Sequence, residues 1–294
     1  MARLIKEFRN FLVASNLWVG LSMGALAWLQ FPNMLGLPAM LYALSLMWAT
    51  AAAYLYIRLV QRNYTDSSSS HLAQLYVREW PQGIAVLALL FALSAGWIWW
   101  RLFTTAQWWL LGPAALIVFL YPLKVKLPLN AFTSLRTLPG LKILLIGIVW
   151  TLLGAVMPAL LSGAAWDAVL LLRIGVVFLL VVAITIPFDV RDLLADAQHL
   201  RTLPQVLGTK GALQLAHFLL LIAQLLVVVQ YLWLEYRIEL ALGWLVGLEI
   251  GQQLVGYCKN THRELFVSFW VEAIPILLFL CVFISRLWLG SLYF

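Results

Sequence analysis

The chain has 294 residues, of which 64% are hydrophobic and 11% are charged, and its net charge is +7. Soluble domains carry roughly 25% charged residues, and this much apolar material cannot be hidden in one water-soluble core, so the composition excludes a soluble globular protein. The two cysteines, Cys258 and Cys281, belong to no CxxC or Cys/His cluster, which excludes a disulfide framework and a cysteine-based metal site.

Long apolar runs follow one another along the whole chain. A helix needs about 20 mostly apolar residues to cross a bilayer, and continuous rather than alternating runs favour helices over a transmembrane barrel. The runs predict nine spans, at residues 11–31, 37–60, 83–103, 105–121, 139–162, 166–187, 211–233, 237–257 and 265–289. The expected fold is an all-α polytopic membrane protein with a single transmembrane domain over residues 1–294 and an uncleaved first span.

The basic residues divide unequally between the two sides of this bundle. With the amino terminus in the cytoplasm, 15 of the 19 Lys and Arg residues fall on the cytoplasmic side and 4 on the other. This asymmetry is typical of membrane topology and explains the positive charge without nucleic-acid binding. The long polar loops, near 61–82, 122–138 and 188–210, then share the cytoplasmic side. We expect a multi-pass protein of a bacterial-type inner membrane with a cytoplasmic active face.

Three aspartates fall within eight residues, near the predicted inner end of the sixth span. Asp189, Asp192 and Asp196 are spaced so that a helix would present all three on one face. Hard oxygen ligands of this kind suit Mg²⁺, which keeps several waters and shares the phosphates of a substrate. Nearby Arg and Lys residues would add contacts to a diphosphate headgroup. The alternative is an ordinary solvated loop whose charges balance one another.

Several motifs resemble those of the UbiA-type prenyltransferase family. The segment from Asp192 to Asp196, followed by Arg201-Thr202-Leu203-Pro204 and Gly208, resembles the second aspartate-rich motif of that family. A further resemblance lies in Tyr121-Pro122-Leu123-Lys124, Pro139-Gly140-Leu141-Lys142 and Trp150-Thr151. Nine spans with long inner loops after the second, fourth and sixth also match the architecture of the family.

The resemblance implies a UbiA-like bundle that transfers an isoprenyl chain from its diphosphate to a lipophilic, often aromatic, acceptor with the help of Mg²⁺. It implies the following roles: Asp192 and Asp196 as metal ligands with Asp189 as a third, Lys124 and Arg201 as diphosphate contacts, and Tyr121 near the reacting carbon. Metal and cations would stabilise the leaving diphosphate electrostatically.

The first aspartate-rich motif of the family is degenerate in this chain. Only Asn63 and Asp66 stand where it is expected, three residues apart instead of four, and no second aspartate follows. Arg58 and Arg62 occupy the preceding helix end with a spacing of four. We hypothesise that this arginine pair binds the diphosphate directly; the alternative is that both arginines only mark the cytoplasmic end of the span.

Other polar residues within the spans are cavity candidates. Asn16 and Glu272 could face a central cavity and contact the acceptor, and Glu249 could do the same, because polar groups inside a bilayer are costly. Hydrogen bonding between helices explains each of them equally well.

Three functional classes follow from these features. The leading hypothesis is a prenyltransferase-like enzyme, with a terpene cyclase of the same fold as a close variant. The second is a non-catalytic protein that binds a prenyl lipid, which the degenerate first motif keeps open. A transporter is disfavoured because no inverted repeat or matched pair of broken helices is present in the sequence. Neither the acceptor nor the oligomeric state follows from the sequence.

Overall fold

The computed structural model describes residues 2–32, 34–62, 77–123, 125–126, 132–133, 140–193, 202–234, 237–259 and 264–290. Its helices are α1 (Ala2–Ala14), α2 (Leu17–Leu29), α3 (Leu37–Gln61), α5 (Pro81–Leu102), α6 (Thr105–Leu120), α7 (Leu141–Thr151), α8 (Met157–Leu161), α9 (Ala168–Asp192), α10 (Leu203–Trp233), α11 (Ile238–Tyr257), α12 (Glu264–Phe266) and α13 (Ile274–Gly290). Two π-helical segments, η2 (Leu152–Val156) and η4 (Val267–Val271), continue α7 and α12. The short strands β1 (Val125–Lys126) and β2 (Phe132–Thr133) pair antiparallel.

The described helices bear out a multi-pass membrane protein. Seven helical stretches are long and apolar enough to cross a bilayer, and the bent pair of α1 and α2 would add an eighth. The helix α6 is apolar but only 16 residues long. A helix therefore lies on each of the nine predicted spans, whereas nine membrane crossings and the cytoplasmic amino terminus stay predictions.

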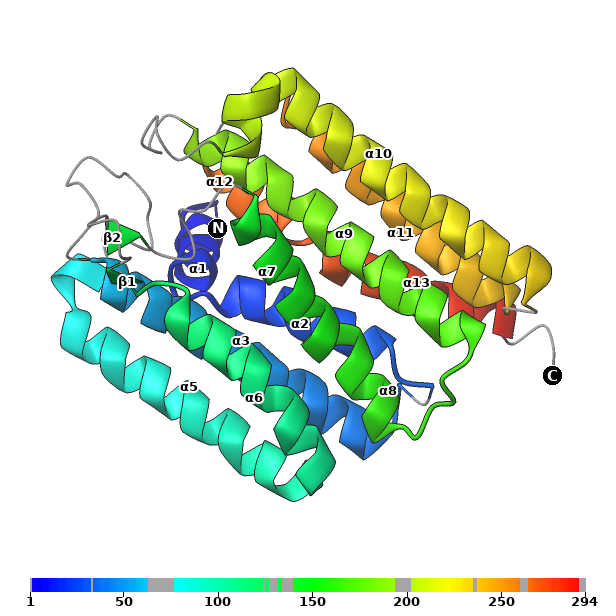
Figure 1. Cartoon of the computed structure of the whole chain (residues 1–294), viewed down its shortest axis with the longest axis horizontal. Coiled ribbons are helices and arrows are strands. Elements are labelled where there is room, and N and C mark those ends of the chain that lie inside the picture. The colour runs from blue at the N-terminus through cyan, green and yellow to red at the C-terminus, as the bar shows by residue number, and fades with distance from the viewer. Residues whose placement is uncertain are drawn as a thin grey trace.

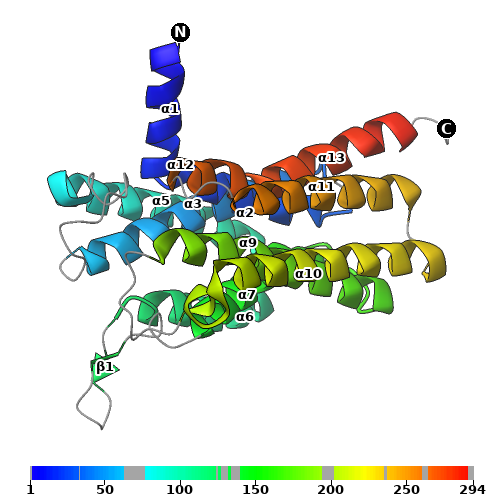
Figure 2. The ribbon, with the colours of Figure 1, turned by 90° about the horizontal axis from the view of Figure 1, so that it is seen from above.

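The first predicted span, 11–31, is not one straight helix. The chain breaks at Asn16, whose φ of 57° is left-handed, and α1 and α2 meet at a bend of 71°. Figure 2 shows α1 standing away from the bundle while α2 lies within it. The physical reason is that α1 carries charged residues such as Glu7 and Arg9 among apolar ones, so it suits an interface more than a bilayer core.

The helices form two layers with the site between them. Figure 2 shows α2, α3, α5, α11 and α13 on one side and α6, α7, α9 and α10 on the other, and Figure 1 places α5 and α10 at opposite edges of the bundle. The buried core runs through the middle of both layers, around fully buried side chains such as Leu26, Leu46, Leu180 and Leu220.

Glycines bring two pairs of neighbouring helices close together. A Cβ at Gly24 of α2 would lie 2.6 Å from the Ala43 carbonyl oxygen of α3, and a Cβ at Gly243 of α11 would lie 2.5 Å from Cα of Val282 in α13. Small residues allow such backbone approach in membrane bundles. By contrast, Gly96 of α5 has open space around its position.

We expect Gly24→Ala to lower the thermal unfolding midpoint, because the added methyl forces α2 and α3 apart at a cost of about 1–3 kcal/mol. The same substitution at Gly96 should be neutral or slightly stabilising, since alanine is the better helix former. Thermal unfolding of the detergent-solubilised variants measures both effects. Equal midpoints for the two variants would contradict close packing at Gly24.

Candidate active site

A cavity of about 410 Å³ lies between the two helical layers. One end is apolar, with Met23, Trp99, Leu111 and Leu153 among its lining residues. The other end carries the polar lining residues Asn16, Tyr54, Arg58, Gln61, Tyr121, Lys142, Arg191, Asp192, Ser268 and Glu272. The cavity is therefore amphiphilic, with room for an apolar chain at one end and for a charged group at the other.

Helix ends explain why the polar residues gather at one end. Arg58, Tyr121 and Asp192 lie at or next to the carboxyl ends of α3, α6 and α9, whereas Asn16 and Lys142 lie where α2 and α7 begin. In a bundle of antiparallel neighbours these ends share one side. Charged side chains such as Arg58 and Asp192 therefore sit where the helices emerge from the apolar layer, and the deeper lining is mostly apolar.

Buried Asn16 and half-buried Arg58 form a hydrogen-bonded pair at the polar end. Arg58 Nε donates a hydrogen bond to Asn16 Oδ1 at 3.1 Å, and Asn16 is only 2% exposed. The Nδ2 group of Asn16 is buried and has no hydrogen-bond partner among the described residues. Because buried polar groups are nearly always bonded, this donor marks a place for a ligand with acceptor atoms.

A second pair joins Asp192 to Arg191. The guanidinium of Arg191 donates from Nε to Asp192 Oδ1 at 2.7 Å and from Nη2 to Oδ2 at 3.1 Å, and its Nη1 donates to Ser268 Oγ at 2.7 Å. It also lies over the Phe188 ring, 5.1 Å from the centroid. This fork-like contact holds the carboxylate firmly and ties α9 to η4.

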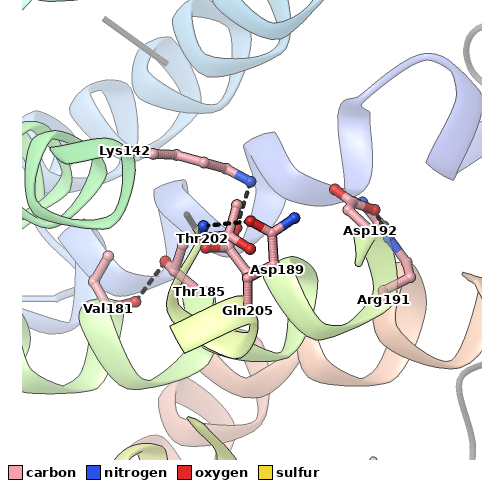
Figure 3. Close-up of polar contacts among 8 residues, drawn as sticks. All are labelled: Lys142, Val181, Thr185, Asp189, Arg191, Asp192, Thr202 and Gln205. Carbon is pink, nitrogen blue, oxygen red and sulfur yellow. Dashed lines mark hydrogen bonds and ion pairs between the residues drawn. The ribbon is translucent and has the colours of Figure 1, made fainter. Parts of the chain in front are cut away.

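Asp189 has a different neighbour. Its carboxylate forms an ion pair with Lys142 of α7, and its side chain is 3% exposed. Figure 3 shows Lys142 pointing at Asp189 and Arg191 lying beside Asp192, so the two carboxylates have separate partners. Asp192 lines the cavity and Asp189 does not. Both aspartates lie within α9, which continues to Asp192. The predicted loop over 188–210 thus begins later than expected.

Side chains of α2 and α3 hold the two π-helical segments in place. Trp18 Nε1 donates to the Phe269 carbonyl at 2.8 Å, and the Ser22 hydroxyl donates to the Glu272 carbonyl. Tyr42 does the same for the Leu153 carbonyl at 2.7 Å. These carbonyls thus find side-chain partners, and π-helical turns often occur at functional sites. The side chain of Glu272 lines the cavity just after η4.

The structure brings together part of the predicted site. Asp192, Tyr121, Arg58, Asn16 and Glu272 all line the cavity. Arg62, one turn beyond Arg58 at the carboxyl end of α3, is exposed and does not line it. Asp196, Lys124 and Arg201, together with Asn63 and Asp66, lie outside the described residues.

Glu249 faces another part of the molecule. It lines a groove between α10 and α11 and does not line the cavity. Sequence reasoning missed Tyr54 and Ser268 as lining residues and counted Arg191 only among the basic residues near the aspartates. The position of Arg191 between two aspartates was the available signal, whereas a single serine in an apolar run gives none.

The carboxylates present are chemically suited to a magnesium ion. Among the described residues no group of three His, Cys, Asp or Glu side chains is placed to hold a metal. Mg²⁺ nevertheless needs only one or two carboxylates when it keeps waters and substrate phosphates. Asp192 at the polar end of the cavity meets that need, since each of its oxygens retains lone pairs beyond the bond from Arg191.

Comparison with solved structures identifies the architecture. The chain is similar to a UbiA homologue from Archaeoglobus fulgidus bound to GPP and Mg²⁺, with 16% identity, a TM-score of 0.59, and coverage of 94% of this chain and 99% of that one. The same homologue bound to DMAPP and Mg²⁺ gives 16% identity, a TM-score of 0.56 and coverage of 94% and 98%. A structure from work on digeranylgeranylglyceryl phosphate synthase gives 14% identity, a TM-score of 0.55 and coverage of 95% and 98%.

No family model matches the sequence, and the curated proteins include no match. The structural likeness nevertheless covers nearly the whole chain, and it agrees with the motifs around Asp192 and Tyr121. At identities this low it is the fold that the comparison establishes: the chain folds as a UbiA-type transmembrane helical bundle.

Proposed function

We propose that the chain is a membrane-embedded, prenyltransferase-like enzyme that uses an isoprenyl diphosphate and a lipophilic acceptor such as an aromatic ring. The observation that carries the proposal is the amphiphilic cavity with an unpartnered amide donor, Asn16 Nδ2, beside the half-buried guanidinium of Arg58. An isoprenyl diphosphate matches both ends of this cavity. The fold shared with a homologue bound to GPP, DMAPP and Mg²⁺ supports the same substrate class.

In this proposal the diphosphate binds at the polar end. Arg58 and Asn16 donate to its oxygens, and Lys142 and Arg191 add positive charge from the opposite layer. By resemblance, Lys124 and Arg201 would also contact it. The isoprenyl chain lies toward Met23 and the other apolar residues. This polar end is expected to face the cytoplasm, because the basic residues are concentrated on that side.

Asp192 would hold Mg²⁺ on the diphosphate, together with Asp196 by resemblance. The bound ion would supply charge stabilisation for the leaving group. Arg58 and the other cations stabilise the same negative charge as the carbon–oxygen bond breaks and the diphosphate leaves with the electron pair. The allylic cation is captured by the acceptor, which then loses a proton.

Other lining residues would act on the reacting groups. Tyr54, Tyr121 and Trp150 line the cavity, and aromatic rings can stabilise a carbocation. The Glu272 carboxylate also lines the cavity and is the proposed acceptor of the released proton. Asp189 supports the site from behind by fixing Lys142, the partner in its ion pair.

The test is release of diphosphate by the purified full chain. Isoprenyl diphosphates of several lengths are supplied with Mg²⁺, with and without a membrane-lipid extract, and Asp192→Asn is the control. We expect release that requires the extract and falls about 100-fold or more in Asp192→Asn. Release without extract would instead identify a cyclase or hydrolase. No release from folded protein with any donor would reject the enzyme and favour a prenyl-lipid-binding protein.

A further inference from the structure

A polar groove lies on the outward side of α10 and α11. It has a volume of about 550 Å³, and its polar lining includes His217, Gln224, Glu249, Gln252 and Gln253. Figure 1 places α10 and α11 at the edge of the bundle opposite α5. The groove shares no lining residue with the cavity.

The polar residues form a continuous stripe on the two helices. Glu249, Gln252 and Gln253 lie on one face of α11, because residues three and four apart are neighbours on a helix. Gln253 Nε2 donates to Glu249 Oε1 at 2.7 Å, and Gln224 Nε2 of α10 donates to Glu249 Oε2 at 3.2 Å. The stripe is therefore an organised hydrogen-bonded set centred on one carboxylate.

Because this polar stripe lies on transmembrane helices, its side chains need a partner that shields them from lipid. Both helices are long and apolar enough to span a bilayer, and the side chains of Glu249 and Gln253 are exposed on the outside of the bundle. Ionisable residues in transmembrane segments almost always face a bundle interior, an aqueous cavity or a partner, because hydrocarbon does not solvate them. Within the described chain no helix covers these two side chains.

We propose that this face, formed by His217, Gln224, Glu249, Gln252 and Gln253, is the interface at which two copies of the chain associate in the membrane. A two-fold axis along the membrane normal keeps every group at its own depth, so the face of one copy meets the same face of the other. Such an interface has to be self-complementary. A face with donors and an acceptor at similar depth satisfies that condition.

The hydrogen-bond inventory supports a second copy as the occupant. Each glutamine amide that donates to Glu249 retains one N–H and its carbonyl oxygen, and a carboxylate that accepts two bonds has capacity for roughly two more. The remaining donors of one copy can therefore bind the Glu249 carboxylate of the other. Exposed apolar residues beside the stripe, Phe218, Leu225 and Val246, supply packing around it.

Cysteine cross-linking in native membranes tests the proposal. The native cysteines are first removed as Cys258→Ala and Cys281→Ala. Single cysteines are then placed beside the stripe, as Leu221→Cys or Val246→Cys, which leave its polar groups intact. The matched control is Leu93→Cys on α5, which is 60% exposed at the opposite edge. Two differently tagged versions are co-expressed, so that a disulfide-linked pair of copies is identified by both tags.

We expect Leu221→Cys or Val246→Cys to form the doubly tagged dimer and Leu93→Cys not to form it. In purified protein, Glu249→Leu should raise the dimer dissociation constant about tenfold, whereas Glu249→Gln should raise it much less. Monodisperse elution and an unchanged thermal midpoint confirm that each variant is folded. The proposal is overturned if cross-linking is no stronger than at Leu93→Cys, if the adduct contains a different protein, or if Glu249→Leu leaves dimerisation unchanged. None of these outcomes bears on the proposed enzymatic function.

Discussion

Replacing Arg58 with glutamine should weaken binding of geranyl diphosphate by about 10- to 100-fold, because a charged donor to the phosphate oxygens is worth about 1.5–3 kcal/mol. Replacing Arg62 with glutamine should leave the affinity nearly unchanged. Arg58 is on the cavity wall and bonded to Asn16, whereas Arg62 is exposed beyond the last residue of α3. Titration calorimetry of the detergent-solubilised variants with geranyl diphosphate measures both affinities.

The two substitutions are chemically identical and four residues apart, so each controls for the other. Arg58→Lys should give an intermediate affinity, since lysine restores the charge but not the forked geometry of the guanidinium. Equal losses at both positions would instead support the arginine pair suggested by the sequence. No loss at either position, in protein with a normal thermal midpoint, would place the diphosphate elsewhere.

Breaking the ion pair between Lys142 and Asp189 should destabilise the fold strongly. Asp189→Leu leaves the largely buried ammonium of Lys142 without its carboxylate, and removal of one partner of a buried pair costs about 3–5 kcal/mol. Adding Lys142→Met to Asp189→Leu should restore most of the lost stability, because two apolar side chains of similar size can replace a buried pair.

Thermal and denaturant unfolding of the wild type, both single variants and the double variant gives the coupling between the two residues. A double variant that is no more stable than Asp189→Leu would show that the pair does not act as a unit. In that case Asp189 would be available for another role, including the metal-binding role that the family resemblance implies.

The sequence predicts the bundle well because hydropathy is a local property. A helix lies on each predicted span, and the observed helices differ from the predicted spans mainly in where they begin and end. The break at Asn16 is different, because it depends on a left-handed residue within an apolar run. The signal that was present is the charged pattern of the first 14 residues, which differs from that of the apolar residues that follow.

The candidate site is only partly predictable, because spacing fixes neighbours on one helix and not partners across helices. Asp189 and Asp192 are three apart, yet one pairs with Lys142 and the other with Arg191. Arg58 and Arg62 are four apart, yet only Arg58 lines the cavity, because the lining does not extend one turn further along the helix. Which neighbour each charge meets depends on how the layers pack.

The outward orientation of Glu249 could have been predicted from the sequence. Gln252 and Gln253 follow it at spacings of three and four, so a polar face on this helix could have been recognised. Glu249 and Glu272 were both candidates for the cavity, and of these two only Glu272 lines it.

The π-helical segment η4, just before Glu272, changes the direction in which the residues after it point around the helix axis. Each residue turns an α-helix by about 100°, so one extra residue rotates everything that follows it relative to what came before. The last transmembrane segment can thus turn Ser268 and Glu272 to the cavity while α13 keeps its apolar face against α11. In a regular helix through the same residues, Ser268 and Glu272 would be rotated by about 100° relative to α13. The irregular turn thus lets one segment belong to the site and to the scaffold.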